Sequence, residues 1–462
     1  ASGSVAGYYV ADKKLPSWVI AFSSNSTGEI AWLLLGLTGM GYAVGFHALW
    51  VVVGEFLGVL VAWKYVARPF KEYTDRHDSI TVPDYLESRF HDKGHVIRVI
   101  SMIIIVSMVT AYTAAQLTAS GKVFGSFLNT SYSMGVWIGA VVILYYTTVG
   151  GFKAVAYSDL FQGVLMFMCL AVLPVVGITA AGGWSSMVEG LRAQDPSLLG
   201  PMGAAGFSLR GIIDVAGFIA IGLAFMGSPQ LLTRFIAARR HRDIVQGGRI
   251  AVFCILVFDL GAVFGGMAGR VLFPGLADQE TILPVMSSSL FPALFTGIFL
   301  VVVLAAIMST ADSLLILASS AVVRDIVQQI FHPDVSERQL SLYGKGVTVV
   351  IGAAALAAAL TEARAIFWFV LFAWSGLASA FTPVVLCSLF WKGTTRAGAI
   401  AGMVCGFLAA VLWVLLLKGR FFDLYEMIPG FAVGFVVTIG VSLATSPPPG
   451  AGEVMWWASA VL

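Results

Sequence analysis

Long apolar segments recur along the whole chain and are separated by short polar connections. A bilayer with a hydrocarbon core of ~30 Å requires about 20 helical residues per crossing. The connections between the segments do not resemble folded soluble domains. The pattern therefore predicts twelve membrane-spanning helices, at residues 17–43, 46–66, 97–120, 133–150, 154–180, 212–236, 248–274, 294–322, 345–362, 366–391, 396–417 and 428–445.

Composition excludes most other classes of protein. Of the 462 residues, 58% are hydrophobic and 11% are charged, whereas about 25% are charged in an ordinary soluble domain. Mean hydropathy is +0.90. A soluble enzyme or a disordered chain needs more charge, and an outer-membrane barrel shows short alternating segments instead of long apolar runs. We therefore predict an all-α polytopic membrane protein.

The distribution of Lys and Arg predicts the orientation of these helices. With the N-terminus on the cytoplasmic side, 20 of the 27 basic residues fall on that side, as the positive-inside rule requires. The basic stretch Arg234–Arg242 could also suggest nucleic-acid binding, but it is a short connection between two predicted spans. We expect the lipid bilayer as a partner and no nucleic acid.

Two of the predicted helices contain features that interrupt helical structure. The first carries seven consecutive polar or helix-weakening residues, Ser23–Glu29, and the sixth carries Gly227, Ser228 and Pro229. Proline lacks a backbone N–H and breaks the helical ladder. Each break alone could be a packing kink. Together, five helices apart, they favour a transporter built from inverted repeats with a central binding site.

Five acidic residues fall inside the predicted spans, where an ionisable group costs about 2.5–3.5 kcal/mol on insertion scales. Such residues require a partner or a function. Asp159 could instead lie at a solvated helix end. The sequence shows no partner for Glu55 in helix 2 or for Asp259 in helix 7. The five are Glu29, Glu55, Asp159, Asp259 and Asp312.

The eighth predicted helix presents a row of oxygen ligands. Ser309, Asp312 and Ser313 are spaced to share one helical face, with Thr310 beside them. Oxygen ligands suit a hard cation such as Na⁺ and argue against Zn or Cu. A hydroxyl-rich helix interface would explain the hydroxyl groups but not Asp312. No metal-ligand histidine pair or catalytic motif is present, so we expect a transporter and no enzyme.

Several long stretches resemble the sodium:solute symporter family, and most closely its bacterial sodium/proline branch. They are Tyr8–Gly28, Ala31–Gly45, Ser79–Phe90, Thr147–Phe167, Gly227–Arg239, Leu304–Leu315 and Phe372–Met403. The resemblance implies a LeuT-type fold in a single membrane domain, with inverted repeats at 17–180 and 212–391 and additional helices at 396–445. It also implies a further helix before residue 1.

The resemblance also implies specific ion and solute sites. The first sodium site would use the carbonyls of Ser26, Glu29 and Ala306 with the hydroxyls of Ser309 and Thr310. A second sodium site, present in some members, would match Asp159, Ser309, Asp312 and Ser313. The solute pocket would contain Thr27, Gly28, Trp32, Tyr112, Phe225, Pro229 and Trp374.

Two positions depart from the family pattern. Gly28 stands where the proline branch typically has Asp, and Ile30 where the family often has Ser. Both lie in the helix that would bind the first sodium ion. These departures bear on the coupling ion and on the identity of the solute.

The expected function is sodium-coupled import of a small carboxylate-bearing solute by alternating access. L-proline is the favoured solute, with one or two Na⁺ as coupling ions. Alternatives are pantothenate, a short carboxylate, a sugar or sialic acid. A sensor built on a transporter fold is an alternative of another class. The expected location is the bacterial inner membrane, with no obligate protein partner.

Overall fold

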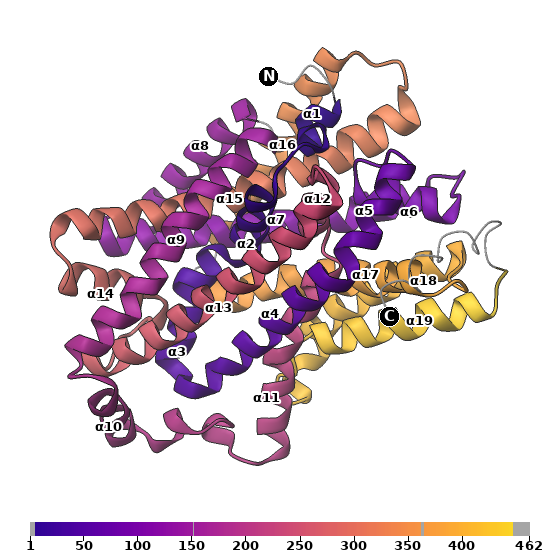
Figure 1. Cartoon of the computed structure of the whole chain (residues 1–462). Helices are drawn as coiled ribbons and strands as arrows, with labels where there is room; N and C mark the ends of the chain where they lie inside the picture. Colours follow the sequence, from indigo (N-terminus) through magenta and orange to yellow (C-terminus); the bar gives the residue numbers. More distant parts are fainter. Residues whose placement is uncertain (1–4, 151, 362–364, 447–462) are drawn as a thin grey trace.

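The computed structural model describes residues 5–150, 152–361 and 365–446. Nine of its described helices are long and apolar enough to cross a membrane, and two shorter apolar helices cover Tyr132–Thr148 and Met427–Leu443. The helices form one bundle, with α10 (Trp184–Gln194) and α11 (Leu209–Ala220) at one end and α1 (Val5–Val10) and α6 (Val82–Phe90) at the other (Figure 1).

Helices occupy all twelve predicted positions. Helices 1, 2, 6, 8 and 11 are divided into segments, whereas the others are each one α-helix. In chain order the twelve are α2 (Ser17–Ala31) with η2 (Trp32–Leu37) and α3 (Thr38–Val44); α4 (Leu49–Val61) with η4 (Ala62–Val66) and α5 (Ala67–Arg76); α7 (Val96–Leu128); α8 (Tyr132–Gly150); α9 (Phe152–Ala180); α11 (Leu209–Ala220) with η7 (Ile221–Met226) and α12 (Pro229–Ala237); α13 (His241–Leu272); α15 (Ala293–Val322) with η9 (Val323–Phe331); α16 (Glu337–Thr361); α17 (Ile366–Phe390); α18 (Arg396–Leu412) with η10 (Trp413–Leu417); and α19 (Met427–Leu443).

The predicted interruption of helix 1 is wrong in its position and kind. The polar run Ser23–Glu29 is α-helical, and the irregular part is the π-helical segment Trp32–Leu37. The run remains helical because its side chains find partners on neighbouring helices: Asn25, for example, donates to the carbonyl of Ala251 at 2.8 Å. The widening of the helix falls one turn later, in an apolar stretch.

The predicted interruption of helix 6 is confirmed. Gly227 and Ser228 leave the helical conformation, and Pro229 begins α12. Proline suits this first helical position because its missing N–H would have no intrahelical partner there. Gly227 lies against helix 10, where a Cβ would be 2.3 Å from the Cα of Thr382. The break therefore requires glycine for close packing.

The first helix lies at the centre of the bundle. α2 packs against α9, α12, α13 and α15, while α17 packs against α7 and η7. Large apolar side chains cover the outer surface of α8 and α9, including Val141, Tyr145, Phe161 and Val175, all more than 60% exposed. A polar interior and an apolar exterior are the arrangement expected for a protein in lipid.

Close backbone contact between helices 2 and 6 generates a prediction. A Cβ on Gly222 would lie 1.8 Å from the carbonyl oxygen of Gly54, whereas Gly440 has nothing within 4 Å. We expect Gly222→Ala to separate η7 from α4 and to destabilise the protein by about 1–3 kcal/mol, as overpacking does. Thermal unfolding in detergent checks this. Gly440→Ala is the control, and equal melting temperatures would contradict the packing argument.

Candidate functional site

A buried polar cluster joins helices 1, 5, 6 and 8. Asp159 of α9 is fully buried. Its carboxylate accepts hydrogen bonds from Ser23 at 2.7 Å and from Ser309. The backbone carbonyl of Asp159 accepts a further bond from Ser26 at 3.0 Å. The structure thus brings together Asp159 and Ser309, the first two members of the predicted second sodium set.

Arg234 of α12 lies at the centre of this cluster. Its side chain is 1% exposed and pairs with Asp159 at 3.3 Å. The same guanidinium nitrogen donates to Thr27 and to Ser313, each at 2.7 Å. The guanidinium group therefore occupies the position between Asp159 and Ser313 where the sequence predicts a sodium ion.

This role of Arg234 is not predicted from the sequence, in which the basic stretch Arg234–Arg242 reads as a cytoplasmic connection. The residue is instead within the nine-residue helix α12, which continues to Ala237. The sequence does contain a signal for this position, because Gln230 and Arg234 are spaced one helical turn apart after Pro229 and can share a helical face. In the structure, Arg234 donates to the carbonyl of Gln230 at 2.8 Å.

The remaining residues of the helix 8 face divide between two environments. Asp312 accepts a hydrogen bond from Thr147 of α8, a residue that is not among the predicted site residues. The Thr310 hydroxyl is buried without a partner among the described residues, and Ala306 is also buried. Asp312 therefore contacts α8, whereas Ser309 and Ser313 contact the Arg234 cluster.

Helix 1 offers fewer free carbonyls than the sequence predicts. Ser26 lies within α2, and the carbonyl of Glu29 accepts the backbone N–H of Trp32. The side chain of Ile30 lies outside the described residues. Backbone N–H groups at Thr27 and Gly28 are likewise within the helix. The half-helix N-terminus that could attract an anionic solute is therefore that of α12.

Four of the predicted solute residues form one aromatic cluster. A Cβ on Gly28 would lie 3.0 Å from the Phe225 ring. Phe225 and Trp374 have ring centroids 5.3 Å apart, and Tyr112 lies edge-on to Trp374 at 6.5 Å. The Trp374 indole donates to the carbonyl of Ile221 in η7 at 3.1 Å. This cluster lies beside the break in helix 6.

The other three predicted solute residues have different surroundings. Trp32 stacks on Phe367, with centroids 5.5 Å apart. Thr27 binds Arg234, as described above, and Pro229 begins α12. The structure therefore separates the predicted set into an aromatic cluster and residues that support the helices around it.

Glu29, Glu55 and Asp259 form a second buried polar group. One carboxylate oxygen from each lies within 4.8 Å of the others. The three belong to α2, α4 and α13, far apart in the sequence. From the sequence each is costly to bury, but Glu55 and Asp259 have no predicted partner. The meeting of the three residues is visible only in the structure.

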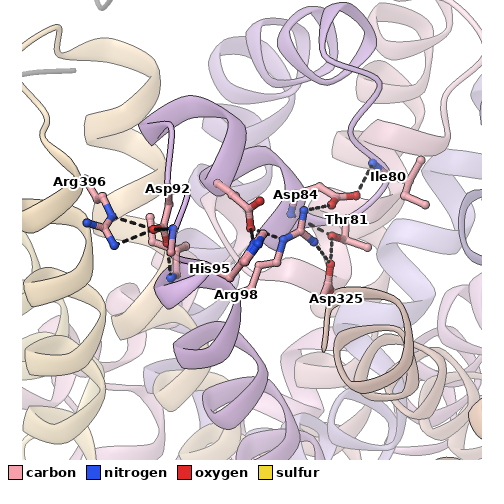
Figure 2. A network of polar contacts seen from close by, with 11 residues as sticks. Ile80, Thr81, Asp84, Asp92, His95, Arg98, Asp325 and Arg396 are labelled. Carbon is pink, nitrogen blue, oxygen red and sulfur yellow. Dashed lines mark hydrogen bonds and ion pairs between the residues drawn. The ribbon is translucent and has the colours of Figure 1, made fainter. Parts of the chain in front are cut away.

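An ion-pair network lies on the predicted cytoplasmic side (Figure 2). Arg98, at the start of α7, pairs with Asp84 at 2.5 Å and Asp325 at 2.7 Å, and also with Glu87. Thr81 donates to Asp325 at 2.8 Å. These contacts tie α6 and α7 to η9, the end of helix 8.

The cavities beside the site are unequal. Between the Arg234 cluster and the cytoplasmic network, a cavity of about 20 Å³ is lined by Ser313 and Asp325, room for about one water. On the opposite side, a cavity of about 190 Å³ is lined by Ile221 and Tyr425. A third cavity, of about 490 Å³, is lined by residues of the cytoplasmic network, among them Asp84, Glu87 and Arg98.

A family model for the sodium:solute symporter family matches residues 8–406. The chain belongs to this family. It is 34% identical to the high-affinity proline transporter PutP of Bacillus subtilis (strain 168), with 97% of this chain and 94% of that protein covered. It is 33% identical to a sodium/proline symporter of Staphylococcus aureus, with 97% and 89% covered. This chain is a sodium-coupled solute symporter in a membrane and not an enzyme.

Solved structures confirm the fold. A Na⁺-coupled sialic acid symporter in a substrate-bound outward-open state matches with a TM-score of 0.81 at 17% identity, over 96% of this chain and 93% of that chain. A nucleobase-cation-symport-1 family transporter in a closed conformation matches with a TM-score of 0.56 at 11% identity, over 98% of each. The LeuT-type fold predicted from sequence is thereby confirmed.

The buried pair generates a prediction about stability. Arg234→Gln leaves the Asp159 carboxylate buried without a charged partner, which typically costs about 3–5 kcal/mol. Thermal unfolding of the purified protein measures this loss. The control is Arg239→Gln, because the Arg239 side chain is 49% exposed in its pair with Asp243 and exposed pairs contribute about 0–1 kcal/mol. Similar effects of the two substitutions would contradict the assignment.

Proposed function

We propose that this symporter imports L-proline. The observation that carries this proposal is the identity of 34% and 33%, over 97% of the chain, to a proline transporter and a sodium/proline symporter. The aromatic cluster supports it, because three aromatic rings beside a glycine suit a small apolar ring.

The proposed solute site lies between Gly28 and the break in helix 6. Phe225 and Trp374 contact the apolar part of the solute, and Tyr112 closes the cluster. The solute carboxylate binds at the N-terminus of α12, where the hydroxyl of Ser228 is buried and has no partner within the described part of the chain. The positive end of a half-helix favours an anion there.

The proposed sodium site lies between α2 and α15. Ser and Thr hydroxyls inside helices usually bond to a carbonyl one turn back, and Thr310 does not. Thr310, Ser309 and the Ala306 carbonyl are proposed as ligands, joined by carbonyls of Ser26 and Glu29 when helix 1 loosens. A second ion at Asp159, Ser309, Asp312 and Ser313 requires Arg234 to withdraw.

Sodium coupling explains how such a site accumulates solute. An inward sodium charge supplies about 2.3 kcal/mol per 100 mV, and about 1.4 kcal/mol corresponds to a tenfold concentration ratio. One ion therefore drives substantial accumulation. Sodium bound between α2 and α15 stabilises the arrangement in which the outer side is open, and the cytoplasmic network opens later in the cycle.

Proteoliposomes test the proposal. We expect an inward Na⁺ gradient, and not a K⁺ gradient, to drive uptake of labelled L-proline. Gly28→Val places a side chain against Phe225 and should weaken the apparent proline affinity at least about tenfold, as a misfit group in a pocket does.

Gly297→Ala is the matched control, since a Cβ at Gly297 has nothing within 4 Å. Sodium-driven uptake of pantothenate, a sugar or sialic acid in place of proline would contradict the proposed solute while leaving the family intact. An unchanged proline affinity in Gly28→Val would contradict the proposed position of the site.

A further inference from the structure

The contacts of Arg98 lie between two cavities on the predicted cytoplasmic side. The cavity of about 20 Å³ is lined by Asp325 at the end of helix 8 and by Arg234 of the buried polar cluster. The cavity of about 490 Å³ is lined by Arg98 and Asp84. No described residue lines both cavities. The ion pair of Arg98 with Asp325, at 2.7 Å, therefore joins the wall of one cavity to the wall of the other.

The guanidinium group of Arg98 contacts a different carboxylate with each of its nitrogens (Figure 2). Its Nε pairs with Glu87, its Nη1 with Asp325 and its Nη2 with Asp84. Glu87 and Asp84 lie on α6, whereas Asp325 lies on η9. A planar guanidinium can hold several acceptors in a fixed geometry, which the single ammonium group of lysine cannot. Arg98 therefore holds α6 against the end of helix 8.

Asp325 depends on this contact for its charged partner. The residue is fully buried. Its Oδ1 accepts from Arg98 and from Thr81, at 2.7 and 2.8 Å, and its Oδ2 has no partner among the described residues. The neighbouring Arg324 donates instead to Gln328 at 2.9 Å. A buried carboxylate that loses its charged partner is costly unless water reaches it, so separation from Arg98 requires that Asp325 become hydrated.

Polar residues of helix 8 connect Asp325 with the buried polar cluster. Ser313, whose hydroxyl accepts a bond from Arg234, and Ser320 line the same small cavity as Asp325. Ser313 and Ser320 are two helical turns apart and share one face of α15. This face leads from the cluster toward the large cavity, and the contacts of Asp325 with Thr81 and Arg98 lie across its end.

A second ion pair attaches the same segment to helix 11. Asp92, between α6 and α7, pairs with Arg396 of α18 at 2.7 Å. The Asp92 carboxylate also accepts the backbone N–H of Ile97 at 2.7 Å, so it helps to begin α7. Arg396 lines neither of the two cavities. The segment is therefore attached at two points, of which only the contact with Asp325 lies between the cavities.

We propose that the contact of Asp325 with Arg98 and Thr81 is the inner gate of this symporter, and that the exit route follows helix 8 from Ser313 past Ser320 to Asp325. The gate opens when η9 separates from α6, because water then reaches Asp325 and the two cavities join. The Asp92 pair keeps the segment on α18 during this movement. The place of this step after binding of sodium and solute rests on the proposed function, whereas the position of the gate does not.

Thiol accessibility tests the position of the gate. Ser320 is 5% exposed and lines the small cavity. The variant Ser320→Cys is treated, in inside-out membrane vesicles without Na⁺, with a methanethiosulfonate reagent that carries a trimethylammonium group. We expect the added substitution Asp325→Ala to speed modification at least about tenfold, which corresponds to about 1.4 kcal/mol in the opening equilibrium. The chain without Ser320→Cys measures the background from its four native cysteines.

Arg396→Gln in the Ser320→Cys chain is the matched control. It removes an ion pair from the same segment without touching either cavity, and the rate of modification should stay unchanged. Equal rates with and without Asp325→Ala would overturn the proposal, as would an equal acceleration by Arg396→Gln. Arg98→Lys keeps the positive charge but not the three contacts, and it repeats the test should Asp325→Ala fail to fold.

The second test is transport, and it rests on the proposed function. A protein that spends less time open to the outside binds external sodium with a lower apparent affinity. We expect Asp325→Ala to raise the Na⁺ concentration for half-maximal proline uptake at least about threefold, and Arg396→Gln to leave it unchanged. An unchanged value in Asp325→Ala would overturn the gate. If the wild type takes up no proline, the proposed solute fails, whereas the thiol measurement still decides where the gate lies.

Discussion

The ion pair between Asp159 and Arg234 is the contact on which the polar interior of this protein depends. Charge is expensive inside a bilayer, and this pair lies where helices 1, 5, 6 and 8 meet. Ser23, Ser309 and Ser313 complete its hydrogen bonds. Each helix can hold its polar residues at this depth because the others supply the partners.

This arrangement links the ion site to the conformation of helix 6. Arg234, which pairs with Asp159, lies on α12, the helix that begins directly after the break at Gly227–Ser228. The same break places Phe225 beside Gly28 and creates the helix end proposed for the solute carboxylate. Movement of α12 would therefore alter both sites. The Arg98 network joins α6, α7 and η9 on the predicted cytoplasmic side.

The sequence predicted the spans and the break in helix 6 because long apolar runs and proline act locally. It also grouped Asp159 with Ser309, because the resemblance to the family implies a second sodium site that contains both residues. It misjudged Ser23–Glu29, since tertiary contacts such as Asn25 with Ala251 retain polar residues in a helix. The meeting of Glu29, Glu55 and Asp259 depends on the packing of three distant helices, which no local pattern reveals.

The repeats at 17–180 and 212–391 remain a prediction, although the fold that contains them is confirmed. The solute and the ligands of sodium remain proposals that rest on this geometry. They share one requirement, which is that sodium binds where α2 meets α15. Thr310 and Ser309 mark that position, since the Thr310 hydroxyl has no partner among the residues that the structure describes and the Ser309 hydroxyl donates to Asp159.

The most direct measurement is the melting temperature of the purified protein as a function of Na⁺ concentration at constant ionic strength, for the wild type and for Thr310→Val. Ligand binding to the folded state stabilises it by about 2.7 kcal/mol at a hundredfold excess over Kd. The account predicts that Na⁺ but not K⁺ raises the melting temperature of the wild type, and that the variant loses this response. An equal sodium response in both proteins would contradict a sodium site between helices 1 and 8.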